Sequence, residues 1–103
     1  MKQKTKMFIL PSDPPNIFDP YKVKKMANLF SAIDDSQRQL LINKLSNGAK
    51  GTNDLGYKNK AEYMTLLRNL NILYVVGIVE KTTAPVRYSL NKETVDKVLD
   101  ILF

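Results

Sequence analysis

The sequence contains no cysteine and no histidine. Without cysteine the chain forms no disulfide and has no thiolate for metal or redox chemistry. Without histidine it lacks the commonest metal ligand and the commonest general base near neutral pH. It has no glycine-rich phosphate loop, and the adjacent Asp34 and Asp35 suit helix capping better than paired catalysis, because neighbouring helical side chains point about 100° apart. We therefore expect no enzyme, no cofactor and no metal site.

Long apolar runs are also missing. The longest early run, residues 7–10, ends at Pro11. A membrane span needs about 18 apolar residues, and this run is also too short for the core of a secretory signal. With 44% hydrophobic residues among 103, the chain is expected to fold as one globular domain. We expect a cytoplasmic protein with no membrane partner.

The charge of the chain is moderately basic, with 16 lysines and arginines, 10 acids and a net charge of +6. Residues 1–25 hold six lysines and two aspartates, residues 50–68 carry +2, residues 77–90 carry +1, and residues 91–103 carry −1. The basic surplus therefore favours the N-terminal arm, residues 50–68 and the segment that follows them, which suits a polyanionic partner. The alternative is that these lysines only keep the surface soluble.

Prolines separate an N-terminal arm from the folded domain. Residues 1–18 combine lysines, a short apolar patch and three prolines, a composition incompatible with a long helix. We expect a basic arm here, with residues 7–10 docked on the body or on a second subunit, or with its lysines along DNA phosphates. The domain over residues 19–103 would begin at Asp19-Pro20, which is typical of a helix start. A buried stripe is expected on this first helix, formed by Val23, Met26, Ala27, Phe30 and Ile33.

The centre of the chain predicts a helix-turn-helix. A second helix after residues 34–36 would place Leu41 and Leu45 on its apolar face and stop at Asn47-Gly48. We then expect a short helix carrying residues 54–56, a turn at residues 59–61, and a second helix over residues 62–75, the reading helix. Gly56 is expected where the two helices cross at close range. The shared apolar seam would consist of Leu55, Leu66, Leu70 and Leu73.

The last part of the sequence predicts a wing and a final helix. Residues 78–81 and 86–90 alternate like strands around a polar tip, and a hairpin directly after a helix-turn-helix is a wing. Asn91 would cap a helix that carries surplus apolar residues, which favours pairing. The predicted fold is thus mainly α with a small β-hairpin, a winged helix-turn-helix. We expect a homodimer that pairs through the first and last helices, with contacts from Val23, Phe30, Val98, Ile101, Leu102 and Phe103.

The outward face of the reading helix is the candidate surface for double-stranded DNA. Steps of about 100° per residue place Ala61, Met64, Thr65 and Arg68 opposite the leucine seam. Arg68 has the donor fork that reads guanine O6 and N7, while Thr65 and Met64 suit a thymine methyl group. Lysines at the turn would neutralise phosphates, and wing charges would reach the backbone or the minor groove. The expected DNA-binding residues are Lys58, Lys60, Met64, Thr65, Arg68, Lys81 and Arg87.

The order of these elements and several local patterns resemble the ArsR family, the arsenical-resistance-type bacterial repressors. Residues 26–48, MANLFSAIDDSQRQLLINKLSNG, are similar to the opening of that family, including an arginine, here Arg38, before an apolar helix. Residues 54–56 fall on its Glu-Leu-Ala, residues 69–73 on its His-Leu-x-x-Leu, residues 77–79 on its Gly-Leu-Val, and residues 87–90 on its returning wing strand. The resemblance covers residues 19–103.

This resemblance implies a homodimeric winged-helix repressor that binds a two-fold symmetric operator. The cysteines that many members carry before the reading helix are absent, so metal or thiol sensing is not implied. Leu67 stands where the family often has serine, and Asn69 stands where it has histidine.

Two other functions fit the same fold. Winged helices also serve as protein-docking modules, and the outward face of the reading helix has few polar residues. Alternatively, dimers would coat repeated DNA sites as a plasmid partition or nucleoid adaptor. Fold does not decide among these functions. Only a DNA binder loses affinity for random duplex log-linearly with salt.

Overall fold

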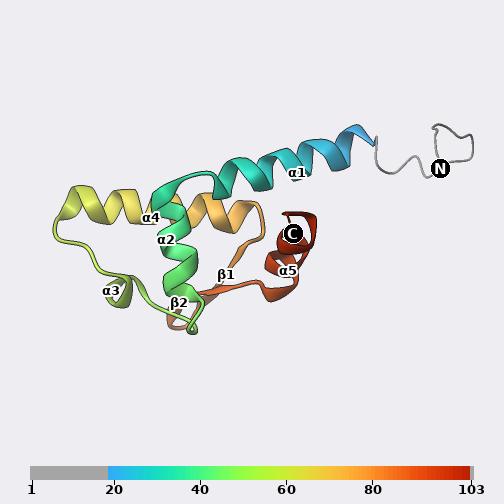
Figure 1. Ribbon diagram of the computed structural model, residues 1–103. Coiled ribbons are helices and arrows are strands. Elements are labelled where there is room, and N and C mark those ends of the chain that lie inside the picture. Colours follow the sequence, from blue (N-terminus) through green and yellow to red (C-terminus); the bar gives the residue numbers. More distant parts are fainter. Residues whose placement is uncertain (1–18, 103) are drawn as a thin grey trace, which may run out of the picture.

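The computed structural model describes the backbone of residues 19–102 and the side chains of residues 19–100. The predicted arm over residues 1–18 lies outside this range, as do Phe103 and the side chains of Ile101 and Leu102. Helices and one hairpin follow each other as in a winged helix-turn-helix, which confirms the predicted fold class (Figure 1). In order they are α1 (Pro20–Ile33), α2 (Ser36–Leu45), α3 (Thr52–Leu55), α4 (Lys60–Val75), β1 (Val79–Thr83), β2 (Val86–Leu90) and α5 (Lys92–Leu102).

Helix α1 begins as predicted, because the Asp19 carboxylate accepts a hydrogen bond of 2.9 Å from the Tyr21 amide and Pro20 occupies the first turn. The predicted buried stripe is wrong for this chain alone. Val23 is 51% exposed, Met26 is 37% exposed and Ala27 is exposed as well. The N-terminal part of α1 extends beyond the body, and only its last turns pack on the core, where Ala32 is buried (Figure 1).

Helix α2 follows a second aspartate cap. The Asp35 carboxylate accepts hydrogen bonds from the amides of Gln37 (2.9 Å) and Arg38 (3.0 Å). Leu41 and Leu45 are buried, as the periodicity predicts.

The helix-turn-helix is present with different boundaries from those predicted. Helix α3 has four residues and ends at Leu55, so Gly56 is not within it and no close helix crossing occurs there. A methyl group at Gly56 would meet nothing within 4 Å, and the backbone φ of +87° explains the glycine instead. The turn also comes earlier, because the Asn59 side chain caps α4 by accepting a hydrogen bond of 2.9 Å from the Glu62 amide. Lys60 and Ala61 therefore belong to the reading helix.

The wing is an antiparallel pair in which Val79 lies opposite Leu90 and Thr83 lies opposite Val86. This confirms the hairpin, although β1 extends to Thr83 and the turn lies at Ala84-Pro85. The loop before α3 adds a bridge, because Lys50 and Tyr88 exchange backbone hydrogen bonds of 2.8 and 2.7 Å. The wing is thus tied to the helix-turn-helix through the backbone.

The core lies where α2, α4 and β1 meet. The predicted seam is confirmed, because Leu55, Leu66, Leu70 and Leu73 are all buried, and Leu70 and Leu73 are completely inaccessible at 0% exposure. Ile78 and Val79 join them from the start of the wing. Asn91 caps α5 as predicted, accepting a hydrogen bond of 3.1 Å from the Thr94 amide. These contacts fix α4 and the wing in one body.

Candidate nucleic-acid interface

The reading helix α4 has one buried and one exposed face. Its leucines enter the core, while Met64 is 56% exposed and Arg68, Lys60 and Asn71 are also exposed. The N-terminal turns of α4 lie at the outer end of the molecule, away from α1 and α5 (Figure 1). The helix therefore presents an accessible ridge that begins with lysine and continues through Met64 and Arg68.

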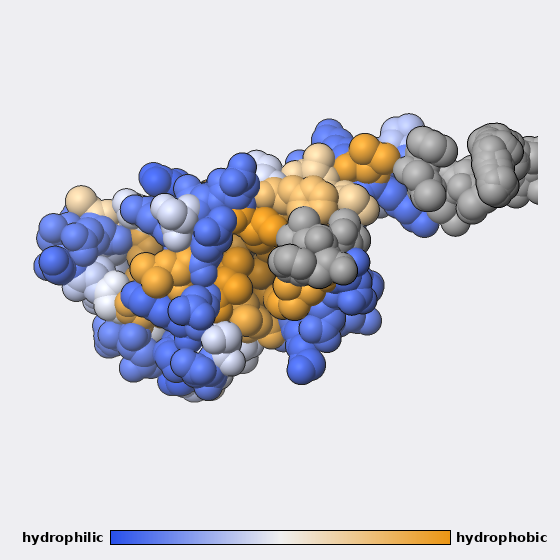
Figure 2. Space-filling view, in the orientation of Figure 1, coloured by the Kyte–Doolittle hydropathy of each residue, from blue (hydrophilic) through white to orange (hydrophobic). Residues whose placement is uncertain are grey.

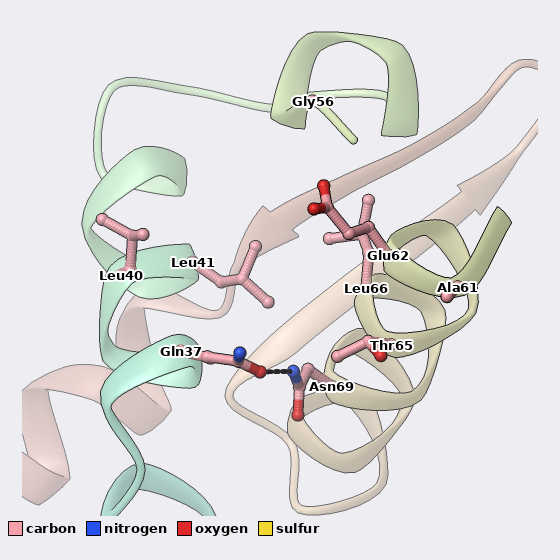
Figure 3. A pocket seen from close by; sticks show the side chains of 9 residues that line it. All are labelled: Gln37, Leu40, Leu41, Gly56, Ala61, Glu62, Thr65, Leu66 and Asn69. Carbon is pink, nitrogen blue, oxygen red and sulfur yellow. Dashed lines mark hydrogen bonds between the residues drawn. The ribbon is translucent and has the colours of Figure 1, made fainter. Parts of the chain in front are cut away.

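Thr65 lies off this ridge, whereas Ala61 is exposed, as predicted. Both line a groove of about 400 Å³ between α2 and α4, together with Gln37, Leu41 and Asn69 (Figure 3). Thr65 is half-buried, so the sequence-based placement on the fully outward face is wrong for this residue. The reason is geometric, since α2 packs against this flank of α4. Thr65 lies on the edge of the exposed ridge.

The turn before α4 places two lysines at the helix N-terminus. Lys58 and Lys60 are both exposed, and the Lys58 amide donates a hydrogen bond of 2.9 Å to Glu62 Oε1. Tyr57 and Tyr63 brace this turn, with ring centroids 4.7 Å apart and ring planes at 55°. The turn is therefore held in place, and its ammonium groups extend into solvent near the free amides of the helix start.

The two wing candidates have different surroundings. Lys81 is exposed on β1 and lines a small groove with Leu67, Asn71 and Tyr74 of α4. Arg87 on β2 donates a hydrogen bond of 2.8 Å to the Ala49 carbonyl and lies 3.9 Å from the Asp54 carboxylate. Its side chain is 44% exposed. Arg87 therefore connects the wing to the segment around α3, a role that the sequence pattern did not reveal.

A polar network that the sequence did not predict lies behind the reading helix. Arg38 donates hydrogen bonds to the Asn69 side chain (3.1 Å), to the Ser31 carbonyl (3.4 Å) and to the Ala32 carbonyl. Asn69 in turn donates to Gln37 Oε1 at 3.1 Å. The sequence signal was available, since Asn69 interrupts the leucine stripe of α4, but its partner is 31 positions away in the sequence.

The pKa of the Asp35 carboxylate is lowered by its neighbours in this region. Hydrogen bonding from the Arg38 amide lowers the pKa of Asp35, and the Arg38 charge, the Gln37 amide and the Arg68 charge act in the same direction against partial desolvation. Asp35 therefore stays ionised at neutral pH, and the Arg68 guanidinium lies near enough to contribute.

Some of the predicted dimer-contact residues are buried within the chain, and others are exposed. Val98 is 7% exposed within its own chain, beside an apolar cavity of about 230 Å³ lined by Ile33, Ile42 and Ile78. Phe30 is half-buried and Val23 is exposed. Apolar surface gathers between α2 and α5 and along the projecting part of α1 (Figure 2).

A metal-binding cluster and a membrane-spanning helix are both absent from the described part of the chain. No cluster of three or more acids that would hold a metal ion occurs among these residues. None of the described helices combines the length and the apolar character that a membrane crossing requires.

Comparison with known proteins adds one structural match. No protein-family model matches the sequence, and no curated protein matches it. Among solved structures, the chain is similar to an ArsR-like transcriptional regulator from Rhodococcus sp. RHA1, with a TM-score of 0.69, 20% identity, and coverage of 80% of this chain and 79% of that one. The chain therefore has the winged helix-turn-helix fold of that ArsR-like regulator.

Proposed function

We propose that this protein binds double-stranded DNA in a sequence-specific manner and acts as a homodimeric transcriptional repressor that does not sense metal. The observation that carries this proposal is the exposed ridge of α4. It combines lysines at the helix start with Met64 and Arg68, and it lies beside a wing that carries Lys81. The structural similarity to an ArsR-like transcriptional regulator supports the same reading.

The ridge suits the major groove of DNA, which admits an α-helix. Arg68 would place its guanidinium on guanine O6 and N7, and Met64 would pack on a thymine methyl group. Thr65, at the edge of the ridge, would contact a thymine methyl or a phosphate. Lys58 and Lys60 would neutralise phosphates at the start of α4.

The wing would reach the DNA backbone or the minor groove next to the reading helix. Lys81 is exposed and has the freer side chain for this role. Arg87 would add a contact from the exposed part of its guanidinium while it keeps its hydrogen bond to Ala49. The two residues therefore differ in how much their loss would disturb the protein itself.

A second copy of this chain would cover the apolar surface of α1. Val23 and Met26 are exposed on the part of α1 that extends from the body, and Phe30 continues the stripe. Such a face on a helix is expected to pair. A two-fold dimer would present two reading helices to half-sites spaced by about one helical turn of DNA. The C-terminal residues Ile101, Leu102 and Phe103 would add to this interface.

The second candidate is a protein-docking module. It is favoured by the apolar residues on the exposed side of α4, where Met64, Tyr74 and Val75 are 56%, 49% and 71% exposed. A partner protein with an apolar groove would bind these apolar residues of α4 rather than the lysines.

Selection of bound duplex from a random pool tests the proposal. A DNA-binding repressor yields one preferred site with two-fold symmetry, and its affinity for random duplex falls log-linearly with salt. A docking module yields no enrichment and no such salt dependence. Footprinting of the selected site then distinguishes one discrete operator from an extended coat, as a partition or nucleoid adaptor would give.

A further inference from the structure

Asn69 is a polar side chain placed on the buried face of the reading helix. It is 4% exposed, and within residues 19–100 it is the only buried polar residue. A buried amide destabilises a fold unless its polar atoms are hydrogen-bonded. Here both are bonded. Oδ1 accepts a hydrogen bond of 3.1 Å from Arg38. Nδ2 donates one of 3.1 Å to Gln37 (Figure 3).

Arg38 links this amide to a third helix. Its guanidinium donates to the carbonyl groups of Ser31 and Ala32, which lie in the last turn of α1, where carbonyls lack helical partners. Its side chain is 14% exposed, and its charge is offset by Asp35 at 3.9 Å. One side chain of α2 therefore contacts both the end of α1 and the middle of α4.

The hydrogen bonds supply a constraint that the leucine seam does not. Apolar contacts are non-directional, so the leucines hold α4 on the core without specifying its rotation tightly. A planar guanidinium and a planar amide fix both distance and angle. Asn69 is adjacent in sequence to Arg68 and lies one turn after Thr65. A rotation of α4 at Asn69 would therefore carry both residues of the proposed DNA-binding surface with it.

We infer that Arg38 and Asn69 are positioning residues that set the orientation of the reading helix relative to the end of α1. The inference rests on the proposed function for its effect on DNA binding. Because α1 is also the proposed dimer helix, the pair connects the spacing of the two subunits to the placement of each reading helix. Neither residue needs to contact DNA for this role.

The variants Arg38→Lys and Asn69→Leu test this inference. Lysine keeps the positive charge but loses the fork, and leucine keeps the branched shape of Asn69 but loses both hydrogen bonds. Gln39→Ala is the matched control, because Gln39 Nε2 donates to the Ile33 carbonyl at 2.9 Å and so contacts the same end of α1 from the same helix. No hydrogen bond from Gln39 to α4 occurs among the described residues.

The DNA measurement compares dissociation constants for the selected site and for random duplex over a salt series, at a temperature where circular dichroism shows each variant folded. Each test variant should bind the selected site about tenfold more weakly or worse. The double variant should lose less affinity than the sum of the two single losses, since the hydrogen bond between Arg38 and Asn69 is lost in both single variants. The log-log salt slope should not change, and Gln39→Ala should bind like the parent.

The second measurement uses the protein without DNA. Backbone amide signals of residues 64–75 in nuclear magnetic resonance spectra should move in Arg38→Lys and remain in place in Gln39→Ala. Unmoved α4 signals or additive losses of affinity would each overturn the inference. If the parent protein binds no DNA, the proposed function fails and the α4 signals alone decide the positioning role.

Discussion

Replacement of Arg68 by alanine is the most direct test of the reading helix. Arg68 is exposed on α4, and no hydrogen bond from its side chain occurs within residues 19–100. Its removal should therefore change the free energy of unfolding by no more than about 0.5 kcal/mol, as for other surface substitutions. A lost bidentate contact to guanine should cost about 1–3 kcal/mol on the selected site, which is about a 5- to 150-fold loss of affinity.

The assay measures binding of parent and variant to the selected site and to random duplex at one salt concentration. Arg68→Ala should strongly weaken binding to the selected site and hardly change binding to random duplex. The ratio of the two affinities, which measures specificity, should therefore fall. Arg87→Ala is the comparison on the wing. It should weaken both complexes by similar factors and lower the log-log salt slope by about one unit.

Arg87→Ala should also destabilise the folded protein slightly, by about 1 kcal/mol, because it removes an exposed ion pair and a hydrogen bond to the Ala49 carbonyl. Lys81→Ala should lower the salt slope as much as Arg87→Ala does, but without the loss of folding stability. Unchanged binding of the selected site by Arg68→Ala would refute the assignment of α4 as the reading element. The docking module would then be the better account.

Further predictions concern stability and assembly. Leu70→Ala should lower the free energy of unfolding by about 2–5 kcal/mol in urea titrations, because Leu70 is 0% exposed. Met26→Asp should convert a dimer to a monomer in light scattering, and an unaltered mass would contradict pairing through α1. The pKa of Asp35 is lowered, chiefly by the Arg38 amide, so its carboxylate stabilises the fold above the ordinary aspartate pKa. Asp35→Asn, which keeps a cap acceptor, should be less stable than the parent near neutral pH and equally stable once acid has protonated Asp35. Zinc at micromolar concentration should not release DNA, since the chain lacks cysteine and histidine.

Local sequence was sufficient for the order of elements. Caps such as Asp19 and Asn91 act within three residues of their own helix, so their effect does not depend on the rest of the chain. The leucine seam of α4 and the alternation in the wing are also periodic signals within one segment. For this reason the winged helix-turn-helix was predictable, including which leucines are buried.

The tertiary structure decided which faces of these elements are buried and which are exposed. Helix α2 packs against one flank of α4, so Thr65 lines the groove between the two helices. The apolar stripe of α1 is exposed because that helix extends beyond the core, which periodicity alone cannot show.

Contacts between distant residues were equally out of reach. Arg38 meets Asn69 across 31 positions, and Arg87 meets Ala49 across 38. The sequence shows that each of these positions holds an arginine. Which group accepts its hydrogen bond depends on how the helices and the wing pack together. The sequence by itself therefore determined the fold and its candidate DNA-facing helix, whereas packing decided which polar side chains orient that helix, because hydrogen bonds require the proximity that only the folded chain provides.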